Sequence, residues 1–239
     1  MWADLLLDLI YPPRCIFCTS IIPIQEERGI CRVCKDTLPF IEGKVCQKCG
    51  KPIQDSKERT TCFDCVKNTP VYDKGWAVFI YEGMVKEAIY RFKYGGHKEY
   101  GKYLGKLMAD RIRNQISEEG FDVIIPIPIH KNRKRKRGYN QAEELAKAIS
   151  RELGIPMDVA ILTRVKETKP QSGLSIMQRQ NNLKKAFKIA DTINLDQMKI
   201  LLVDDIYTTG TTMNYCAGLL KERGAKKVCF LSLSIGQDM

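Results

Sequence analysis

The sequence predicts an α/β fold in which helices flank a parallel sheet, preceded by a small cysteine-rich segment. Two patterns in the 239 residues support this prediction. Short aliphatic runs, typical of strands buried on both faces, alternate with longer runs of helical periodicity throughout residues 71–239. Eight of the ten cysteines fall instead within residues 1–70, all in CxxC pairs. We therefore expect a small domain over 1–70 and an α/β domain over 71–239, each with its own core.

The cysteine pairs form a repeat with an offset of 31 residues. Its members are Cys15, Cys18, Cys31 and Cys34, then Cys46, Cys49, Cys62 and Cys65. A CxxC turn points two thiolates at one tetrahedral Zn²⁺, and a second CxxC closes the shell. The repeat therefore predicts two structural zinc sites in a double zinc ribbon, with unliganded or redox-active cysteines as the alternatives. Equal twelve-residue gaps favour pairing in sequence order, but cross-braced pairing also fits the spacing.

Positive charge is concentrated in the second part of the chain. Residues 1–70 carry a net charge of +1, which leaves +10 of the formal +11 to residues 71–239. That part is therefore expected to bind anions. No run reaches the about eighteen apolar residues of a membrane helix, and the N-terminus lacks the basic start of a signal peptide. We expect a cytoplasmic protein that partner proteins could bring to the inner face of the membrane.

The predicted elements alternate between strands and helices. A short apolar stretch at 3–10, ended by Pro12 and Pro13, predicts a docking helix. After the cysteine repeat, the periodicities predict a strand at 75–81, helices at 84–94 and 100–116, a strand at 121–125, a helix that opens at 138–141 and ends at 153, a strand at 200–203, a helix at 213–223 and a strand at 227–233. Cys216 and Cys229 fall on the last helix and the last strand, where we expect them in the core.

The strand at 200–203 leads into the most informative stretch of the chain. Two acids, Asp204 and Asp205, follow it and can accept hydrogen bonds from two vicinal hydroxyl groups. The next loop offers hydroxyls, a glycine and the free N–H groups of a helix start, which together form a cradle for a phosphate. Its residues are Thr208, Thr209, Gly210, Thr211 and Thr212. The pattern therefore predicts a site for a ribose phosphate.

A basic loop and a polar loop complete the predicted site. After the strand at 121–125 come six cations in seven residues: Lys131, Arg133, Lys134, Arg135, Lys136 and Arg137. Such a loop can hold pyrophosphate, bind nucleic acid or form a solvated surface, and the first two uses can coexist. The polar segment 163–187 predicts a mobile lid that leads into a short helix at 175–184. The candidate residues of this lid are Arg164, Gln171, Arg179 and Asn182.

The stretch 200–212 resembles the signature of the type I phosphoribosyltransferases, which use phosphoribosyl pyrophosphate (PRPP). Through its cysteine pairs, Arg-Gly-Tyr-Asn-Gln at 137–141, the polar lid residues and the acid pair, nearly the whole chain also resembles the ComF (ComFC-type) competence proteins. The resemblance implies that Asp204 and Asp205 hold the ribose hydroxyls, the threonine loop the 5′-phosphate, and the basic loop the pyrophosphate with Mg²⁺. It also implies handling of single-stranded DNA in natural competence, beside other competence proteins such as a DNA-uptake helicase.

Two kinds of function fit these features. As an enzyme, with Asp204 and Asp205 as catalytic residues, the protein would transfer phosphoribose from PRPP to an unidentified acceptor through an oxocarbenium-like transition state. As a non-catalytic module, it would bind single-stranded DNA and use PRPP as a regulatory ligand. A salvage nucleobase phosphoribosyltransferase is a further alternative, although Thr208 stands where hypoxanthine-type relatives carry Asp. Zinc ribbons favour the binding module and the intact acid pair favours the enzyme, so the sequence leaves both open.

Overall fold

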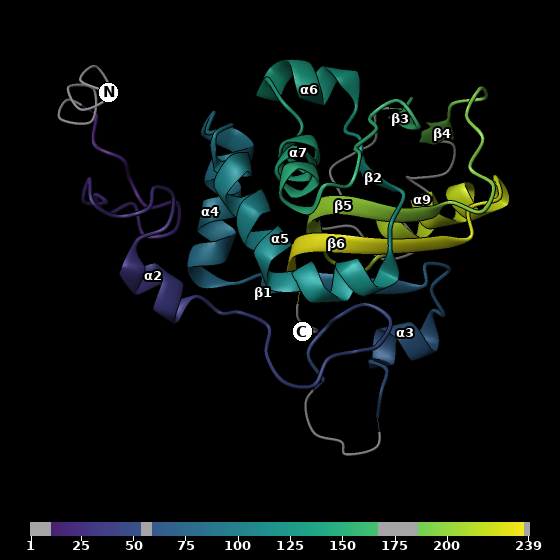
Figure 1. Ribbon diagram of the computed structural model, residues 1–239, viewed down its shortest axis with the longest axis horizontal. Coiled ribbons are helices and arrows are strands. Elements are labelled where there is room, and N and C mark those ends of the chain that lie inside the picture. The colour runs from purple at the N-terminus through teal and green to yellow at the C-terminus, as the bar shows by residue number, and fades with distance from the viewer. Residues whose placement is uncertain (1–10, 54–58, 167–185, 237–239) are drawn as a thin grey trace.

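The computed structural model describes residues 11–53, 59–166 and 186–236. A four-stranded parallel sheet lies at its centre, in the order β1-β6-β5-β2 (Figure 1). These strands are β1 (Lys74–Ile80), β2 (Val123–Pro126), β5 (Lys199–Tyr207) and β6 (Lys227–Ile235). A separate antiparallel pair consists of β3 (Leu162–Arg164) and β4 (Phe187–Ile189). The helices are α2 (Arg32–Thr37), α3 (Phe63–Lys67), α4 (Gly83–Tyr94), α5 (Tyr100–Glu119), α6 (Lys131–Arg137), α7 (Gln141–Leu153) and α9 (Thr211–Glu222).

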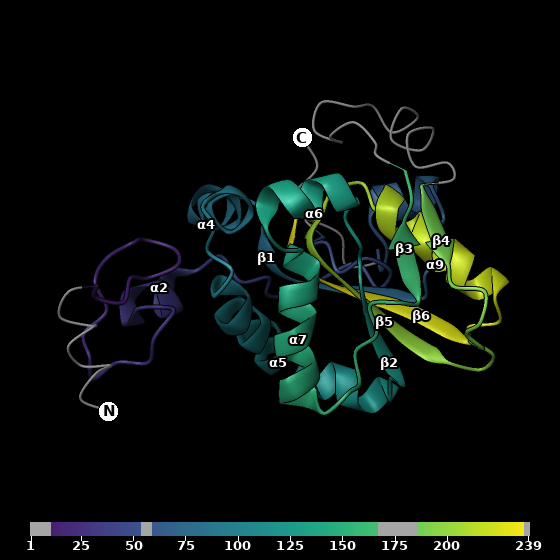
Figure 2. The same cartoon turned by 90° about the horizontal axis from the view of Figure 1, so that it is seen from above.

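The sheet is buried on both faces, as its aliphatic strands predict. Along β5, Leu201 and Val203 face one side while Ile200 and Leu202 face the other, and all four are fully buried. Helices α4, α5 and α7 cover the first side, whereas α9 and the β3–β4 pair cover the second (Figure 2). The predicted fold class, a parallel sheet flanked by helices, is therefore confirmed.

Two glycines allow α5 and α7 to approach each other closely. A Cβ atom at Gly105 would lie 2.6 Å from both the carbonyl oxygen of Leu145 and the Cβ atom of Ala148 on α7. At Gly101, a Cβ atom would lie 2.5 Å from the Cβ atom of Glu144. Because packed interiors leave no spare volume, a side chain at either position would push the two helices apart.

The two cysteine-rich ribbons pack against opposite faces of the sheet. The first ribbon, residues 11–38, shares a hydrophobic core with α4, α5 and Phe79 of β1. The second ribbon, the described part of residues 44–67, shares the core that Tyr72 and α9 form with the other face. The expectation that the N-terminal part has its own core is therefore wrong, since each ribbon completes the cover of one face.

The chain between the two ribbons covers an edge of the sheet. The N–H group of Ile41 donates to the carbonyl oxygen of Val78 on β1 at 3.0 Å. Phe40 packs on Phe79, with 4.8 Å between the ring centroids. This pairing satisfies polar groups that the outer edge of β1 would otherwise expose. The chain thus passes from one face of the sheet to the other along β1.

Most predicted strands and helices agree with the observed ones, but two predictions were wrong. The basic segment 131–137 is helix α6 and not a loop, because Lys and Arg favour helices and the ends are capped. The His130 ring accepts a hydrogen bond from the N–H group of Asn132, and Gly138 closes the helix with a φ of 86°. Strand β5 continues to Tyr207, so the acid pair lies within the strand and not after it.

Two predicted helices, at 3–10 and 175–184, lie outside the described residues. Cys216 and Cys229 are fully buried in the core, as predicted. In the described part of the chain, no helix has the length and hydrophobicity needed to cross a membrane.

The helix contact at Gly105 allows a direct test. Gly105→Ala should lower the free energy of unfolding by about 1–3 kcal/mol, because the new methyl group would overlap the α7 backbone. Gly218→Ala on α9 is the matched control, since a Cβ atom there meets nothing within 4 Å. This control should be neutral or gain up to about 1 kcal/mol from helix propensity. Urea unfolding measures both changes, and equal stability of the two variants would contradict the tight contact.

Candidate functional site

Each set of four cysteines converges on one point. The sulfur atoms lie within 4.8 Å of one another in each cluster, which consist of Cys15, Cys18, Cys31 and Cys34, and of Cys46, Cys49, Cys62 and Cys65. A tetrahedral zinc ion with bonds of about 2.3 Å sets its sulfur ligands about 3.8 Å apart. The observed 3.6 Å between Cys18 and Cys31, and between Cys49 and Cys62, is close to this value. Each cluster thus fits one structural zinc site and joins cysteine pairs that are adjacent in sequence.

The repeat extends from the cysteines to the hydrogen bonds around them. The N–H group of Cys31 lies 3.5 Å from the sulfur of Cys15. Thirty-one residues later, the N–H group of Cys62 lies 3.3 Å from the sulfur of Cys46. Hydrogen bonds to sulfur favour the thiolate form that a zinc ion requires. The same N–H to sulfur hydrogen bond is therefore present in both cysteine clusters.

The acid pair lies near the carboxyl end of β5. Asp205 forms an ion pair with Lys93 at the end of α4, with 2.9 Å between Oδ1 and Nζ. Asp204 accepts a hydrogen bond from the N–H group of Asp205 at 2.9 Å. Burial raises the pKa of Asp204 to about 7, and the neighbouring charge of Asp205 acts in the same direction. One carboxylate is thus paired with a cation, while the other titrates near neutral pH.

Two arginines from other elements interact electrostatically near the acid pair. Arg164 on β3 lies over the ring of Phe187 on β4, with 5.1 Å between the guanidinium carbon and the ring centroid. Burial lowers the pKa of Arg164, and the charge of Arg133 on α6 lowers it further. Arg164 also interacts electrostatically with Asp204. Two like charges are thus held close together, an arrangement that a bound anion would relieve.

The loop after β5 has the geometry of an anion-binding turn. Gly210 precedes α9 with a φ of 72°, and a Cβ atom there would lie 2.2 Å from the hydroxyl oxygen of Tyr207. Glycine alone tolerates both constraints. The hydroxyl groups of Thr209 and Thr211 lie 2.8 Å apart, on either side of Gly210 in the chain. The loop therefore places two hydroxyls at the start of α9, where the helix dipole and the first N–H groups favour an anion.

A buried aromatic cluster connects this loop to the second cysteine cluster. The hydroxyl oxygens of Tyr207 and Tyr72 lie 2.7 Å apart, and the Tyr72 hydroxyl lies 4.0 Å from the sulfur of Cys65. The ring of Tyr207 stacks on Phe230, with 4.8 Å between the centroids and 5° between the planes. Burial raises the pKa of both tyrosines, so both stay protonated. The second ribbon thus helps to position the loop 208–212.

The six predicted cations all lie on α6, but they face different surroundings. Arg133 acts on Arg164, as described above, and Lys134 forms an ion pair with Glu143 at 2.8 Å. The guanidinium carbon of Arg137 lies 5.1 Å from the ring centroid of Tyr94 on α4. The exposed cations that form no ion pair among the described residues are Lys131, Arg135 and Lys136. Helix α6 therefore directs the charge of one arginine toward Arg164 and exposes several cations to solvent.

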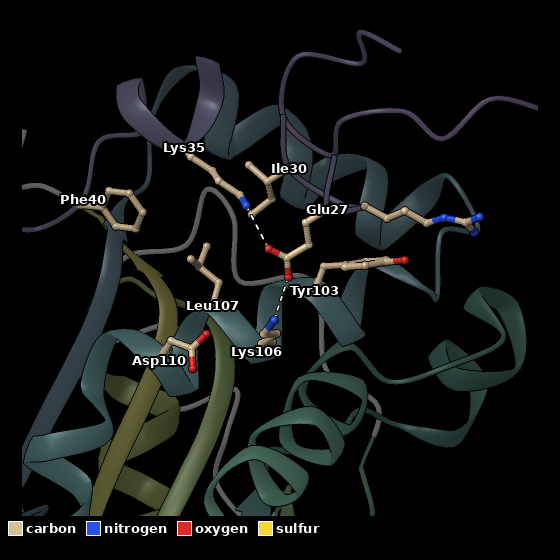
Figure 3. Close-up of a pocket in the computed structure, with 9 residues that line it drawn as sticks. Glu27, Ile30, Lys35, Phe40, Tyr103, Lys106, Leu107 and Asp110 are labelled. Atoms are coloured by element: carbon tan, nitrogen blue, oxygen red, sulfur yellow. Dashed lines mark hydrogen bonds and ion pairs between the residues drawn. The ribbon is translucent and has the colours of Figure 1, made fainter. Parts of the chain in front are cut away.

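A pocket between the first ribbon and α5 is a separate feature (Figure 3). Glu27 of the ribbon lies 3.0 Å from the Nζ atom of Lys35 and 2.7 Å from that of Lys106 on α5. Hydrogen bonds from Lys106 and then Lys35 lower the pKa of Glu27 to about 2. Because these groups satisfy one another, we interpret the pocket as part of the contact between ribbon and helix.

The structure brings together the acid pair, the loop 208–212 and α6 at the carboxyl end of the sheet. Arg164 belongs to β3 and not to a mobile lid, because its segment pairs with β4 and its side chain packs on a buried ring. The other residues predicted for the lid lie outside the described residues: Gln171, Arg179 and Asn182.

Sequence reasoning missed three residues near this site. Lys93 follows a helical pattern at the end of α4, and only the fold brings it to Asp205. Tyr72 and Tyr207 are 135 residues apart in the chain, yet their hydroxyl groups share a hydrogen bond. No local motif marks these residues, because each contact joins segments that are distant in sequence.

Comparison with known proteins assigns each of the two parts of the chain to a domain family. Residues 6–66 match the double zinc ribbon domain, and residues 97–233 match the phosphoribosyl transferase domain. A purine phosphoribosyltransferase structure from Pyrococcus horikoshii is 20% identical, with a TM-score of 0.37 over 56% of this chain and 73% of that chain. The two domain matches and the two cysteine clusters define a phosphoribosyltransferase-domain protein with an N-terminal double zinc ribbon.

Relatives that match over most of their length identify the family within this class of proteins. The chain is 33% identical over 219 residues to competence protein F of Haemophilus influenzae, covering 90% of this chain and 93% of that protein. It is 28% identical over 213 residues to competence protein ComFC of Bacillus subtilis, covering 86% and 83%. It is also 28% identical over 223 residues to DNA utilization protein YhgH of Escherichia coli K12, covering 92% and 96%. The chain belongs to the ComF family.

The raised pKa of Asp204 predicts a pH-dependent stability. The unfolded chain loses this proton near pH 4 and the folded protein near pH 7, so the folded state binds more protons in between and stability falls as pH rises. Asp204→Asn should therefore stabilise the protein at about pH 8 and not at about pH 4. At about 1.4 kcal/mol per pKa unit, the gain is on the order of a few kcal/mol.

Urea unfolding at the two pH values measures this effect. The matched control is Glu118→Gln, which removes an exposed carboxylate from α5 and should change stability little at either pH. An Asp204→Asn effect of the same size at both pH values would contradict the burial of this carboxyl group.

Proposed function

We propose that this protein binds PRPP with Mg²⁺ at the carboxyl end of its sheet and acts on single-stranded DNA in natural competence. One observation carries the proposal. Asp204 and Asp205 on β5 stand beside the hydroxyl-rich loop at the start of α9, so hydroxyl acceptors and an anion cradle lie next to each other. A ribose phosphate has the matching groups. The phosphoribosyl transferase domain match over residues 97–233 supports the same ligand class.

Each residue of the site has a role that its surroundings support. The acid pair would accept hydrogen bonds from the ribose hydroxyls, and the loop 208–212 would donate to the 5′-phosphate. Lys93 holds the carboxylate of Asp205 in place and offsets part of the repulsion between the two acids. The raised pKa of Asp204 means that bound ligand, by donating hydrogen bonds, would favour its charged form.

The two arginines suit the pyrophosphate group. Arg133 and Arg164 lie close enough to repel each other, and an anion between them would turn this repulsion into attraction on both sides. When bound, Mg²⁺ would supply further positive charge to the pyrophosphate oxygens. The structure thus supports a division of α6 in which Arg133 serves PRPP and the outward cations serve another ligand.

In a transfer reaction, the bond between C1′ and the pyrophosphate oxygen breaks, and the electron pair leaves with pyrophosphate. A new bond forms between C1′ and the nucleophilic atom of an acceptor. The arginines would stabilise the leaving group, and the fixed ribose would keep C1′ in line with the acceptor. If PRPP is only a regulatory ligand, the same residues bind it without release of pyrophosphate.

Single-stranded DNA is the proposed second ligand, with α6 as its contact. Lys131, Arg135 and Lys136 are exposed and form no ion pair among the described residues, so they are available to phosphates. The names of the relatives from Haemophilus influenzae and Escherichia coli, which refer to competence and DNA utilization, support this ligand. We place the protein in the cytoplasm, where cysteines stay reduced for zinc, beside other competence proteins such as a DNA-uptake helicase.

The acid pair gives the decisive test of PRPP binding. Asp204→Ala/Asp205→Ala should weaken Mg²⁺-dependent PRPP binding at least about tenfold, because the ribose hydroxyls lose their acceptors. Calorimetry measures the affinity. Asp36→Ala/Glu118→Ala removes two exposed carboxylates elsewhere and controls for the change in net charge. Equal PRPP affinity of the acid-pair variant and this control would show that PRPP does not bind at this edge of the sheet.

The salt dependence of DNA binding tests the role of α6. Arg135→Ala/Lys136→Ala should reduce the slope of log affinity against log salt for single-stranded DNA by about 0.7 for each lost contact. Lys134→Ala should change the slope less, because Glu143 already neutralises this lysine. Fluorescence anisotropy over a salt series measures the slopes. An unchanged slope in the double variant would show that DNA binds elsewhere.

A further inference from the structure

Two tyrosines on α4 expose their rings at one place on the surface. Tyr90 and Tyr94 are 65% and 66% exposed, and their ring centroids lie 4.9 Å apart. They are four residues apart, so they share a helix face, while Ile89 and Phe92 point into the core. Within the described ranges, no other pair of contacting rings has both members exposed. Among the described residues the two rings pack mainly on each other, so this exposed aromatic pair is a candidate binding surface.

Arg137 connects the tyrosine pair to the basic helix. Its guanidinium carbon lies 5.1 Å from the Tyr94 ring centroid, and its side chain donates a hydrogen bond to Gln141. Helices α4 and α6 therefore lie next to each other, as Figure 2 shows. We name the surface of Tyr90, Tyr94 and Arg137 the aromatic platform. It borders the exposed cations of α6.

We propose that the aromatic platform stacks bases of single-stranded DNA whose phosphates bind the cations of α6. This inference rests on the proposed function and assigns the DNA to a particular surface. The platform offers flat apolar faces beside positive charge, and single-stranded DNA offers flat base faces beside negative charge. Tyrosine and arginine faces both accept stacked bases. In a duplex the base faces are covered by their neighbours, so the platform selects single strands.

The platform also adjoins the site for the sugar phosphate. Lys93 immediately precedes Tyr94 on α4 and pairs with Asp205. On α6, Arg133 acts on Arg164, near Asp204. Helix α4 thus contacts the acid pair through Lys93, and α6 acts on Arg164 through the charge of Arg133. A strand on the platform would therefore pass beside the proposed PRPP site.

Two probes of equal charge test the stacking. The first is a labelled oligothymidine of about 20 nucleotides, and the second is an abasic oligomer of the same length, which has the phosphates without the bases. In the full-length protein, Tyr90→Ala/Tyr94→Ala should weaken oligothymidine binding at least about tenfold. Binding of the abasic oligomer should change less than about twofold, because its phosphates still meet α6. Fluorescence anisotropy measures both affinities.

Two further variants separate stacking from other effects. Tyr90→Phe/Tyr94→Phe keeps the rings and should bind oligothymidine as the unchanged protein does. Tyr11→Ala removes a 78% exposed tyrosine outside the platform and should leave both probes unaffected. Thermal melting checks that each variant folds, which is expected since the rings are exposed.

The outcomes distinguish this inference from the proposed function. If the tyrosine variant weakens both probes equally, or neither, the platform does not stack bases. If Arg135→Ala/Lys136→Ala then still weakens both probes, DNA binding by α6 stands without the platform. Failure of the unchanged protein to bind either probe would overturn the platform and the DNA part of the proposed function together, and PRPP binding would remain a separate question. Tighter binding of oligouridine than of oligothymidine would replace DNA by RNA as the ligand.

Discussion

The rest of the structure depends on the burial of strand β5 between two parallel neighbours. It pairs with β2 on one side and β6 on the other, and its aliphatic residues are buried on both faces. This placement confines polar chemistry to the ends of the strand, because a charge in its middle would enter the core. Parallel pairing also brings the segments after β1, β2 and β5 to the same edge. The acid pair, the loop 208–212 and α6 therefore meet there.

A parallel sheet needs cover on both faces, and this chain uses its cysteine-rich ribbons for part of it. The second ribbon approaches β1 so closely that a Cβ atom at Gly50 would lie 2.8 Å from the carbonyl oxygen of Gly75. From the same face, Tyr72 reaches the hydroxyl group of Tyr207, next to the loop 208–212. The second cysteine cluster is thus part of the support of this loop, and the folding energy of a zinc ion bound there would contribute to the position of the loop.

Like charges act on one another twice at this edge. Asp204 lies beside Asp205, and Arg133 acts on Arg164, so the pKa of Asp204 is raised and that of Arg164 is lowered. Such arrangements destabilise a protein by themselves and are therefore concentrated at binding and catalytic sites. A ligand with hydroxyl groups at one end and a polyanion at the other would satisfy both pairs. Farther out, the cations of α6 that form no ion pair in the described part of the chain give the helix a positively charged surface.

The sequence by itself determined the features that depend on neighbouring residues. The CxxC repeat marks the eight cysteines as ligands of two metal sites, the periodicities mark the strands and helices, and the stretch 204–212 carries the acid pair and its loop. Only the tertiary structure decided the sequential pairing of the cysteines, the cores that the ribbons share with the sheet, and the contact of Lys93 with Asp205. Local sequence patterns indicate which face of a segment is apolar and will be buried. Which distant segment covers that face is settled by packing of the whole chain, where shape and burial are optimised together.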